Sequence, residues 1–250
     1  MDRLIYTSLS GQAAIDQRLR QVTNEVSNVN TTGFKSSYAA ALQTFTYEGS
    51  GFPTRYAPSL TPPLTVNMTP GAVETTGQPL DISLSGTQLL SVQAKDGSTA
   101  YTRRGDLHVS ADNTLQTSNG HTVLSDTGTP IVVPALSTVK IGTDGTVFVQ
   151  AQGQQPPQFT PVARLGIVDT PPNSVAMRED ALYQPAPGAT FTPATNPGVS
   201  PGTLEASNAN LFKSMVDMIS LSRQYELEVK TLKNADDLAD RSSTLAKVSP

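Results

Sequence analysis

Both ends of this 250-residue chain carry an apolar repeat with the period of an α-helix, and the sequence between them does not. The N-terminal repeat covers residues 1–29, and the C-terminal one begins at Leu211. At about 1.5 Å per residue, a helix over residues 208–245 would be roughly 57 Å long, whereas a compact globule of this chain length is only about 46 Å across. Such a helix cannot be covered by its own domain. The pattern therefore predicts assembly with other helices before it predicts chemistry.

The apolar positions of both repeats share the heptad spacing of helices that pack against each other. We expect a coiled-coil-like assembly region whose interface residues are Ile5, Ile15, Leu19, Val22, Val26, Val29, Leu211, Met215, Met218, Tyr225, Val229 and Leu232. Stripes of this kind are more often an ordinary core face than an oligomer seam. Here, the length of the second helix and its separation from the first by the whole middle region favour the seam.

Between the helices the apolar period changes to two, which is typical of β-strands. Alternation is clearest at residues 80–84, and residues 131–133 form a continuous apolar run suited to a buried strand. Pairs that supply the positive φ angles of tight hairpins separate such runs, namely Asp96-Gly97, Asn119-Gly120 and Asp144-Gly145. We expect a mainly β central domain, an antiparallel sandwich or barrel, with residues 163–169 and 181–184 as its last strands.

Glycine and proline set the predicted boundaries. The first helix should end near Val29, and the glycines and prolines of residues 48–71 exclude a long helix there, although residues 36–45 could add a short one. A second stretch rich in proline and glycine, residues 185–202, leads to the last helix. The predicted divisions are an N-terminal helix of the assembly region (1–35), an extended linker or arm (36–72), an all-β domain (73–202) and a C-terminal helix of the assembly region (203–250).

Charge and composition exclude several classes of protein. The formal net charge is -4 and the basic residues are scattered, so a nucleic-acid partner is not expected. There is no cysteine, which excludes disulfides and cysteine-ligated zinc. No apolar run approaches the roughly 18 residues of a membrane span, and residues 1–10 lack the pattern of a signal peptide. We therefore expect no membrane insertion and, if the chain is exported, no cleavable signal.

The sequence shows no pattern of an enzyme. The two histidines, His108 and His121, have no carboxylate at a metal-ligand spacing, which favours sheet-surface or packing roles. Asp96, Asp126 and Asp144 lie where turns need them. We expect no catalytic, cofactor or metal site. A two-carboxylate hydrolase and a carbohydrate-binding β module stay as alternatives, and the absence of tryptophan counts against the second.

Motifs at the two break points resemble those of a known family. Residues 27–35, Ser-Asn-Val-Asn-Thr-Thr-Gly-Phe-Lys, resemble the Ala-Asn-x-x-Thr-x-Gly-Phe-Lys signature of the flagellar basal-body rod proteins and their hook relatives. Residues 204–210 resemble the family's Leu-Glu-x-Ser-Asn-Val-Asn motif, with Ala209 in place of the usual valine. The matching motif positions are Asn28, Thr31, Gly33, Phe34, Glu205, Ser207, Asn208 and Asn210.

The resemblance is collinear over nearly the whole chain, because residues 78–82, 101–105 and 120–124 resemble the family's central β domain. Residues 1–7 and 222–226 are most similar to a proximal rod subtype, with the distal rod protein as the runner-up. The family implies a structural subunit that the flagellar type III apparatus exports and that polymerises helically, with itself and neighbouring rod proteins, into the shaft that carries torque through the periplasm. Helical polymers need two different patches that meet, and two dissimilar terminal helices would supply them.

Overall fold

The structure is a computed structural model that describes residues 2–39, 64–153, 156 and 158–248, with only the backbone described at residues 2–10, 38–39, 64, 235–236 and 238–248. The chain folds into two compact units. The helix unit comprises residues 1–27, 39–62 and 210–250, and the β unit comprises residues 28–38 and 63–209. The β unit therefore takes in residues that the sequence analysis grouped with the first helix and the arm. Its framework is discontinuous in sequence.

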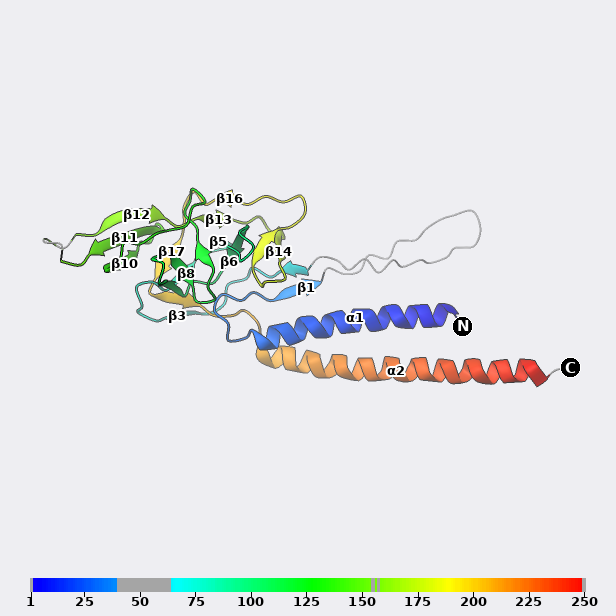
Figure 1. The fold of residues 1–250 in the computed structure, drawn as a ribbon. Helices are drawn as coiled ribbons and strands as arrows, with labels where there is room; N and C mark the ends of the chain where they lie inside the picture. Colours follow the sequence, from blue (N-terminus) through cyan, green and yellow to red (C-terminus); the bar gives the residue numbers. More distant parts are fainter. Residues whose placement is uncertain (1, 40–63, 154–155, 157, 249–250) are drawn as a thin grey trace. The chain divides into compact units, whose positions relative to one another are not determined.

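Two helices lie at the ends of the chain, as the apolar repeats predict: α1 (Asp2–Ser27) and α2 (Leu211–Val248) (Figure 1). Polar contacts show that they run antiparallel, because Gln12 of α1 bonds to Tyr225 of α2 while Glu25 bonds to Ser214. At about 1.5 Å per residue, α1 is roughly 39 Å long and α2 roughly 57 Å. In this register, about the last three turns of α2 extend past the start of α1.

The β unit is built from short strands. Their bounds are β1 (Ser37–Ala39), β2 (Leu64–Val66), β3 (Val73–Thr75), β4 (Ile82–Leu84), β5 (Leu89–Gln93), β6 (Thr99–Thr102), β7 (Leu107–Val109), β8 (Leu115–Thr117), β9 (Thr122–Val123), β10 (Ser137–Ile141), β11 (Thr146–Ala151), β12 (Thr160–Arg164), β13 (Ile167–Asp169), β14 (Val175–Met177), β15 (Tyr183–Pro185), β16 (Thr192–Pro193), β17 (Val199–Pro201) and β18 (Thr203–Glu205).

The largest sheet has the order β1-β2-β14-β15-β6-β5-β9-β8-β7, with β13 and β16 joined to its side at β5. A three-stranded sheet, β10-β11-β12, and the pairs β17-β4 and β18-β3 complete the unit. The paired strands with a defined register are antiparallel, as expected. Gly97, Gly120 and Gly145 have φ angles near +80°, which confirms the predicted hairpin turns after β5, β8 and β10.

The main core lies where strands from both halves of the β unit meet, and Leu90, Val92, Leu115 and Val123 are fully buried in it. A second, smaller cluster lies under β2, β13 and β14, beside the edge-to-face pair of Tyr101 and Phe191. Burying this much apolar surface is the main free-energy source of a folded domain. Within the part of the chain that the structure describes, the β unit thus holds nearly all of the buried apolar side chains.

Several details differ from the sequence-based expectations. The strands form open sheets, and no closed barrel occurs among the described residues. The run at residues 131–133 is not a continuously buried strand. Ile131 and Val133 are buried in the core, but Val132 between them is 57% exposed, and all three lie outside the strands. Strands β16 and β17 lie within residues 185–202, so that stretch belongs to the sheets. At residues 37–39 the chain forms β1 instead of a short helix, and the rest of residues 36–45 lies outside the described part.

Candidate assembly site

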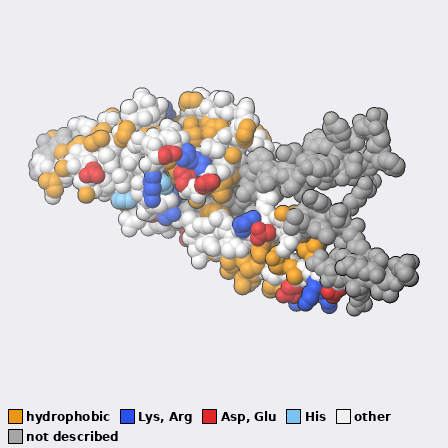
Figure 2. All heavy atoms as spheres, turned by 45° about the vertical axis from the view of Figure 1, so that its right-hand side comes forward, with side chains coloured by type: hydrophobic (Ala, Val, Ile, Leu, Met, Phe, Trp, Pro, Cys, Tyr) orange, Lys and Arg blue, Asp and Glu red, His pale blue; other side chains and the backbone are white. Residues whose placement is uncertain are grey.

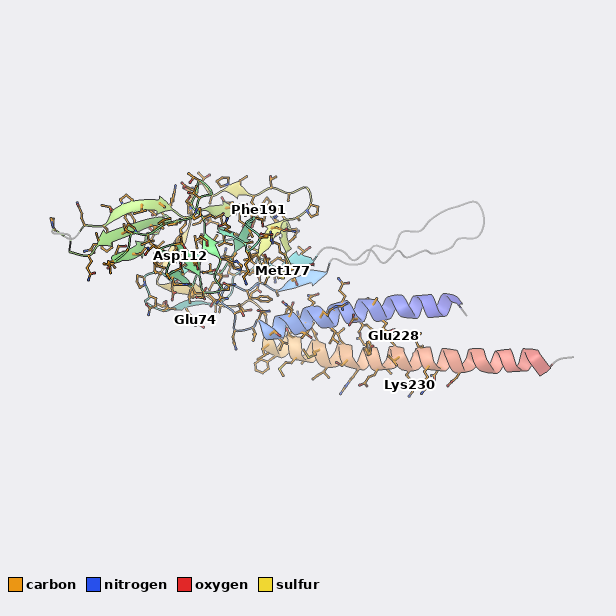
Figure 3. The ribbon with its side chains drawn as sticks, viewed as in Figure 1. Glu74, Asp112, Met177, Phe191, Glu228 and Lys230 are labelled. Atoms are coloured by element: carbon orange, nitrogen blue, oxygen red, sulfur yellow. The ribbon has the colours of Figure 1, made fainter. Side chains whose placement is uncertain are left out.

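One face of each helix packs against the other within the helix unit. Val22 of α1 is 4% exposed, and Leu221 and Ser214 of α2 are 5% and 3% exposed. On α2 this inner face follows helical spacing through Ser214, Met218, Leu221, Tyr225 and Glu228. Glu228 points from α2 toward α1, whereas Lys230 points away (Figure 3). The described part of α2 therefore faces α1 with this one side.

Polar groups lie within this contact. Gln12 Nε2 donates to Tyr225 Oη over 3.1 Å, and Ser214 Oγ donates to Glu25 Oε2 over 3.2 Å. Glu228 Oε1 lies 3.6 Å from the position that a Cβ on Gly11 would take, which is an ordinary van der Waals distance, so α1 and α2 lie close together here. Polar pairs inside a helix contact fix its register at a cost in stability. The α1–α2 contact is thus specific but only weakly apolar.

The opposite side of α2 carries an apolar stripe that no described residue covers. Phe212, Met215, Val216 and Ile219 are 81%, 50%, 66% and 55% exposed. Their spacing of three and four residues places them on one face, roughly opposite Leu221. Hydrophobic side chains gather over the described part of the helices in Figure 2. We call these four residues the outer stripe of α2.

The predicted interface residues do not form one buried surface. Some lie on the inner face of the helices, some are exposed, and one lies outside the helix unit. Val22 is buried, and those that are partly exposed are Ile15, Leu19, Val26, Val29, Leu211, Met218 and Leu232. Met215 and Val229 are exposed at 50% and 42%, and Tyr225 at 38%, although its hydroxyl meets Gln12. Val29 lies past the end of α1, in the β unit. The side chain of Ile5 lies outside the described residues. Within one chain, the seam therefore uses only part of the predicted set.

The N-terminal motif forms a tight turn inside the β unit. Thr31 bonds to Asn28 through both its backbone N–H and its hydroxyl, and Phe34 N–H donates to the carbonyl of Thr31. Gly33 has a φ of +68°, and a Cβ there would lie 2.5 Å from the backbone of Arg103. Only glycine fits this position without strain. Phe34 is then buried, with 7% of its surface exposed.

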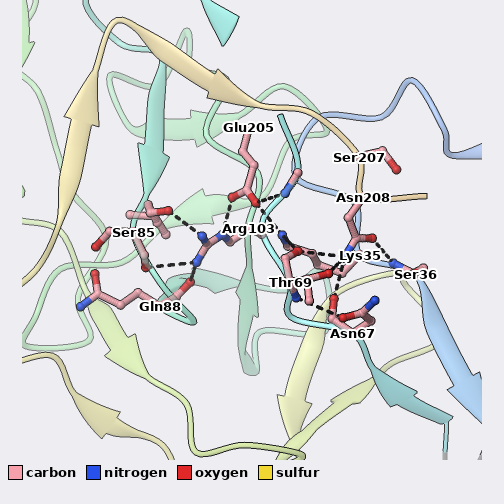
Figure 4. A network of polar contacts seen from close by, with 12 residues as sticks. Lys35, Ser36, Asn67, Thr69, Ser85, Gln88, Arg103, Glu205, Ser207 and Asn208 are labelled. Atoms are coloured by element: carbon pink, nitrogen blue, oxygen red, sulfur yellow. Dashed lines mark hydrogen bonds and ion pairs between the residues drawn. The ribbon is translucent and has the colours of Figure 1, made fainter. Parts of the chain in front are cut away.

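The C-terminal motif binds directly to the N-terminal one. Gly33 N–H donates to the carbonyl of Glu205 over 2.7 Å, and Ser36 N–H donates to Asn208 Oδ1 over the same distance. The amide of Asn208 also donates to the carbonyls of Asn67 and Thr69 (Figure 4). Ser207 Oγ accepts a bond from the N–H of Ala209. The two motifs, far apart in sequence, thus form one structure.

Asn210, the last motif residue, belongs to the helix unit. Its Oδ1 accepts a hydrogen bond from the N–H of Lys213 over 3.0 Å, and its carbonyl accepts one from Ser214 N–H. This is the N-cap arrangement, in which a side-chain oxygen satisfies an N–H group that the first helical turn leaves without a partner. Asn210 therefore defines where α2 begins.

An ion cluster lies beneath the motifs. Lys35 Nζ lies 2.5 Å from Glu205 Oε1, and Arg103 Nε lies 2.6 Å from Glu205 Oε2 (Figure 4). The side chains of all three are at most 2% exposed. Backbone groups complete the shell, because Gly71 N–H donates to Glu205 and Lys35 donates to the carbonyl of Thr69. We call Lys35, Arg103 and Glu205 the buried ion cluster.

Burial and ion pairing shift the pKa values of Lys35 and Glu205 in opposite directions. Burial lowers the pKa of Lys35, and its hydrogen bond to Glu205 offsets this only in part. Burial alone would raise the pKa of Glu205, but the hydrogen bond from Lys35 and the charge of Arg103 outweigh it and lower that pKa. Sequence reasoning placed Glu205 among the motif residues but did not pair it with Lys35 or Arg103. The one indication in the sequence was that Lys35, Arg103 and Glu205 all lie in segments that resemble the family motifs.

The described residues include no candidate metal site. They contain no group of three or more metal-ligating side chains. His108 is exposed on β7, whereas His121 is 5% exposed with a lowered pKa, so these are the surface and packing roles that the sequence suggests. Asp96 and Asp144 accept hydrogen bonds from the turn residues that follow them. Among the described helices, none is long and apolar enough to cross a membrane.

Comparison with known proteins gives consistent matches. The model of the flagellar hook protein FlgE/F/G D1 domain matches residues 83–149, and that of the flagellar basal body rod FlgEFG protein C-terminal region matches residues 200–245. The flagellar basal-body rod protein FlgF of Escherichia coli is 32% identical over the full length of both chains, and that of Salmonella typhimurium 31%. FlgF of Caulobacter vibrioides is 31% identical over 96% of each chain.

Proposed function

We propose that this chain, which belongs to the flagellar basal-body rod proteins and is most like FlgF, polymerises into the rod through α1 and α2. It is a structural subunit and not an enzyme. What the proposal adds is the means of assembly. The observation that carries it is the outer stripe of α2, which lies opposite the α1 contact and has no cover among the described residues.

A helix with apolar residues on opposite sides is normally buried on both sides. The first turns of α2 are of this kind, because Leu221 is buried on the inner side while Phe212 and Val216 are exposed on the other. Exposed apolar patches of this sort mark interaction surfaces. We infer that the outer stripe packs against the helices of a neighbouring subunit, either another copy or an adjacent rod protein. Two different faces of one helix pair meet the requirement of a helical polymer.

The coiled-coil-like character of the assembled region is part of this proposal. So are residence in the periplasmic shaft, export by the flagellar type III apparatus, and retention of the N-terminal segment in the mature rod. Family membership supports them, since the named relatives are basal-body rod proteins. Mass spectrometry of rods tests the last point. A mature chain that begins some twenty residues after Met1 would contradict it.

A charge on the outer stripe provides the direct test. Val216→Asp places a carboxylate on a surface that is exposed in the single chain but buried in the proposed rod, so we expect normal thermal unfolding and loss of incorporation into basal bodies. Gln224→Glu adds the same charge to an exposed position between the two faces of α2 and should assemble normally. If the Val216→Asp protein assembles and supports swimming as the wild type does, the outer stripe is not a subunit contact.

A further inference from the structure

Two buried cations that are far apart in sequence depend on one carboxylate. Lys35 and Arg103 are 0% and 1% exposed, and Glu205 binds both, one through each of its carboxylate oxygens. Among the described residues, Glu205 supplies the only carboxylate within ion-pair distance of either cation. The cluster therefore carries one more positive charge than negative.

Neutral groups take up the remaining hydrogen bonds of the two cations. Arg103 donates to the carbonyls of Leu84 and Gln88, each over 2.5 Å, and Lys35 donates to that of Thr69 over 2.8 Å. Carbonyl dipoles orient these side chains but supply no countercharge. A buried cation without a countercharge loses most of its hydration free energy with little return. Closure of the β unit over Lys35 and Arg103 is thus much less favourable when the carboxylate of Glu205 is missing.

Both cations come before Glu205 in the chain, so the order of the residues decides which charge is made last. Lys35 precedes Glu205 by 170 residues and Arg103 precedes it by 102. A chain is synthesised from its N-terminus, so both cations and nearly all strands are present before Glu205 is. Strands β1 to β17 also precede it, and only β18 contains it. The countercharge arrives with the last strand, directly before α2.

We propose that Glu205 is a folding latch, so that the β unit closes only when residues 203–209 dock. Docking places the Glu205 carboxylate between the two cations, while its carbonyl accepts from Gly33 and Asn208 binds Ser36. Because α2 begins at Leu211, the β unit then completes at the point in the chain where the second helix starts. The latch would keep the chain open until the start of the second helix has been made. This inference does not depend on the proposed rod function.

Substitutions in the full chain test the charge dependence. Glu205→Gln keeps the shape of the side chain but removes the countercharge, and we expect the folded-to-unfolded ratio of the β unit to fall roughly 100-fold or more. The triple variant Lys35→Met, Arg103→Met, Glu205→Met removes all three charges and should recover most of that loss. Glu74→Gln is the matched control, because Glu74 lies on β3, the partner of β18, and is exposed. It should behave as the wild type does.

The order of folding is measured by pulsed hydrogen exchange with mass spectrometry during refolding of the same full-length proteins. In the wild type, we expect amides of β5 and β6 to become protected together with those of β18. In the triple variant, β5 and β6 should be protected earlier, because closure no longer waits for the countercharge. Protection of β5 and β6 well before β18 in the wild type would overturn the latch. So would a triple variant no more stable than Glu205→Gln, since the loss would then reflect packing and not charge.

Discussion

The two units of this chain bury their apolar side chains to very different extents. In the β unit, Leu90, Val92 and Leu115 are completely buried, whereas the described part of the helix unit has only Val22 and Leu221 as buried apolar residues. The helix unit instead exposes an apolar stripe and places polar pairs in its inner contact. The β unit therefore covers its own apolar core, whereas the outer stripe of the helix unit has no cover among the described residues. With the proposed function, stability and assembly would reside in different parts of one chain.

The largest effect on assembly is expected from charges placed in the predicted contact between the terminal helices. Val26→Asp or Leu232→Asp puts an unpaired carboxylate into a contact that the proposed rod buries, at roughly 3–5 kcal/mol per interface. Rod assembly and motility should fail, while the thermal transition of the β unit should stay in place. Charge reversal at Asp237, which is exposed, serves as the control. Normal swimming by the Leu232→Asp strain would show that Leu232 does not lie in a buried helix contact of the rod.

Truncation of one leucine in each unit compares how much the two units contribute to the stability of the β unit. Leu90→Ala leaves a cavity in the main core of the β unit and should destabilise it by about 3 kcal/mol. Leu221→Ala removes a similar volume from α2, but we expect the unfolding of the β unit to shift by less than about 0.5 kcal/mol. Chemical denaturation of the purified chain, followed through signals of the β unit, measures both. Equal effects would mean that the two units unfold together.

The β unit should lose stability in acid as the exposed carboxylate of Asp96 becomes protonated. Hydrogen bonds from Ser98, and then from Arg178, lower the pKa of Asp96 to about 2. The unfolded chain, with an aspartate pKa of about 3.9, binds the proton more readily, so this stabilisation is complete above about pH 4 and lost as the pH falls through about 2. Asp96→Asn should reduce the change in melting temperature between pH 4 and pH 2. An unchanged pH dependence in this variant would assign it to other carboxylates.

The smallest expected effect concerns His121. Burial is the main cause of its lowered pKa, and its Nδ1 has no hydrogen-bond partner among the described residues. Protonation is thus less favourable in the folded state, so the β unit should lose stability as the pH falls below about 6.5. His121→Gln should flatten the melting temperature between pH 7.5 and pH 5.5. The exposed His108 supplies the comparison, and its replacement by glutamine should leave the slope as it is.

Local patterns in the sequence predicted the parts of the fold that local physics decides. The helical repeats gave α1 and α2, and the Asp-Gly and Asn-Gly pairs gave the hairpin turns, because each depends on residues a few positions apart. The run at residues 131–133 misled, since apolar character alone does not show that Val132 faces solvent. Strands β16 and β17 were missed because proline and glycine dominate that stretch.

The candidate site was less predictable for a different reason. Hydrophobic periodicity cannot identify Ser214 or Glu228 as inner-face residues, because their polar side chains look like solvent-exposed ones. As a result, the outer stripe and the inner face of α2 merged into one predicted seam. The ion pair between Lys35 and Glu205 spans 170 residues, and no spacing rule connects such distant positions. Only the fold brings them together.

The neighbouring position of β1 and β2 in the largest sheet has one more consequence. The chain leaves the β unit after β1 and returns at β2, and Asn67 N–H donates to the carbonyl of Ser36 close to that exit. The ends of the intervening segment are thus held together whatever its length. An insertion between Tyr38 and Pro63, whether natural or an engineered fluorescent reporter, would leave both of these ends anchored in the sheet, so the β unit should keep its stability.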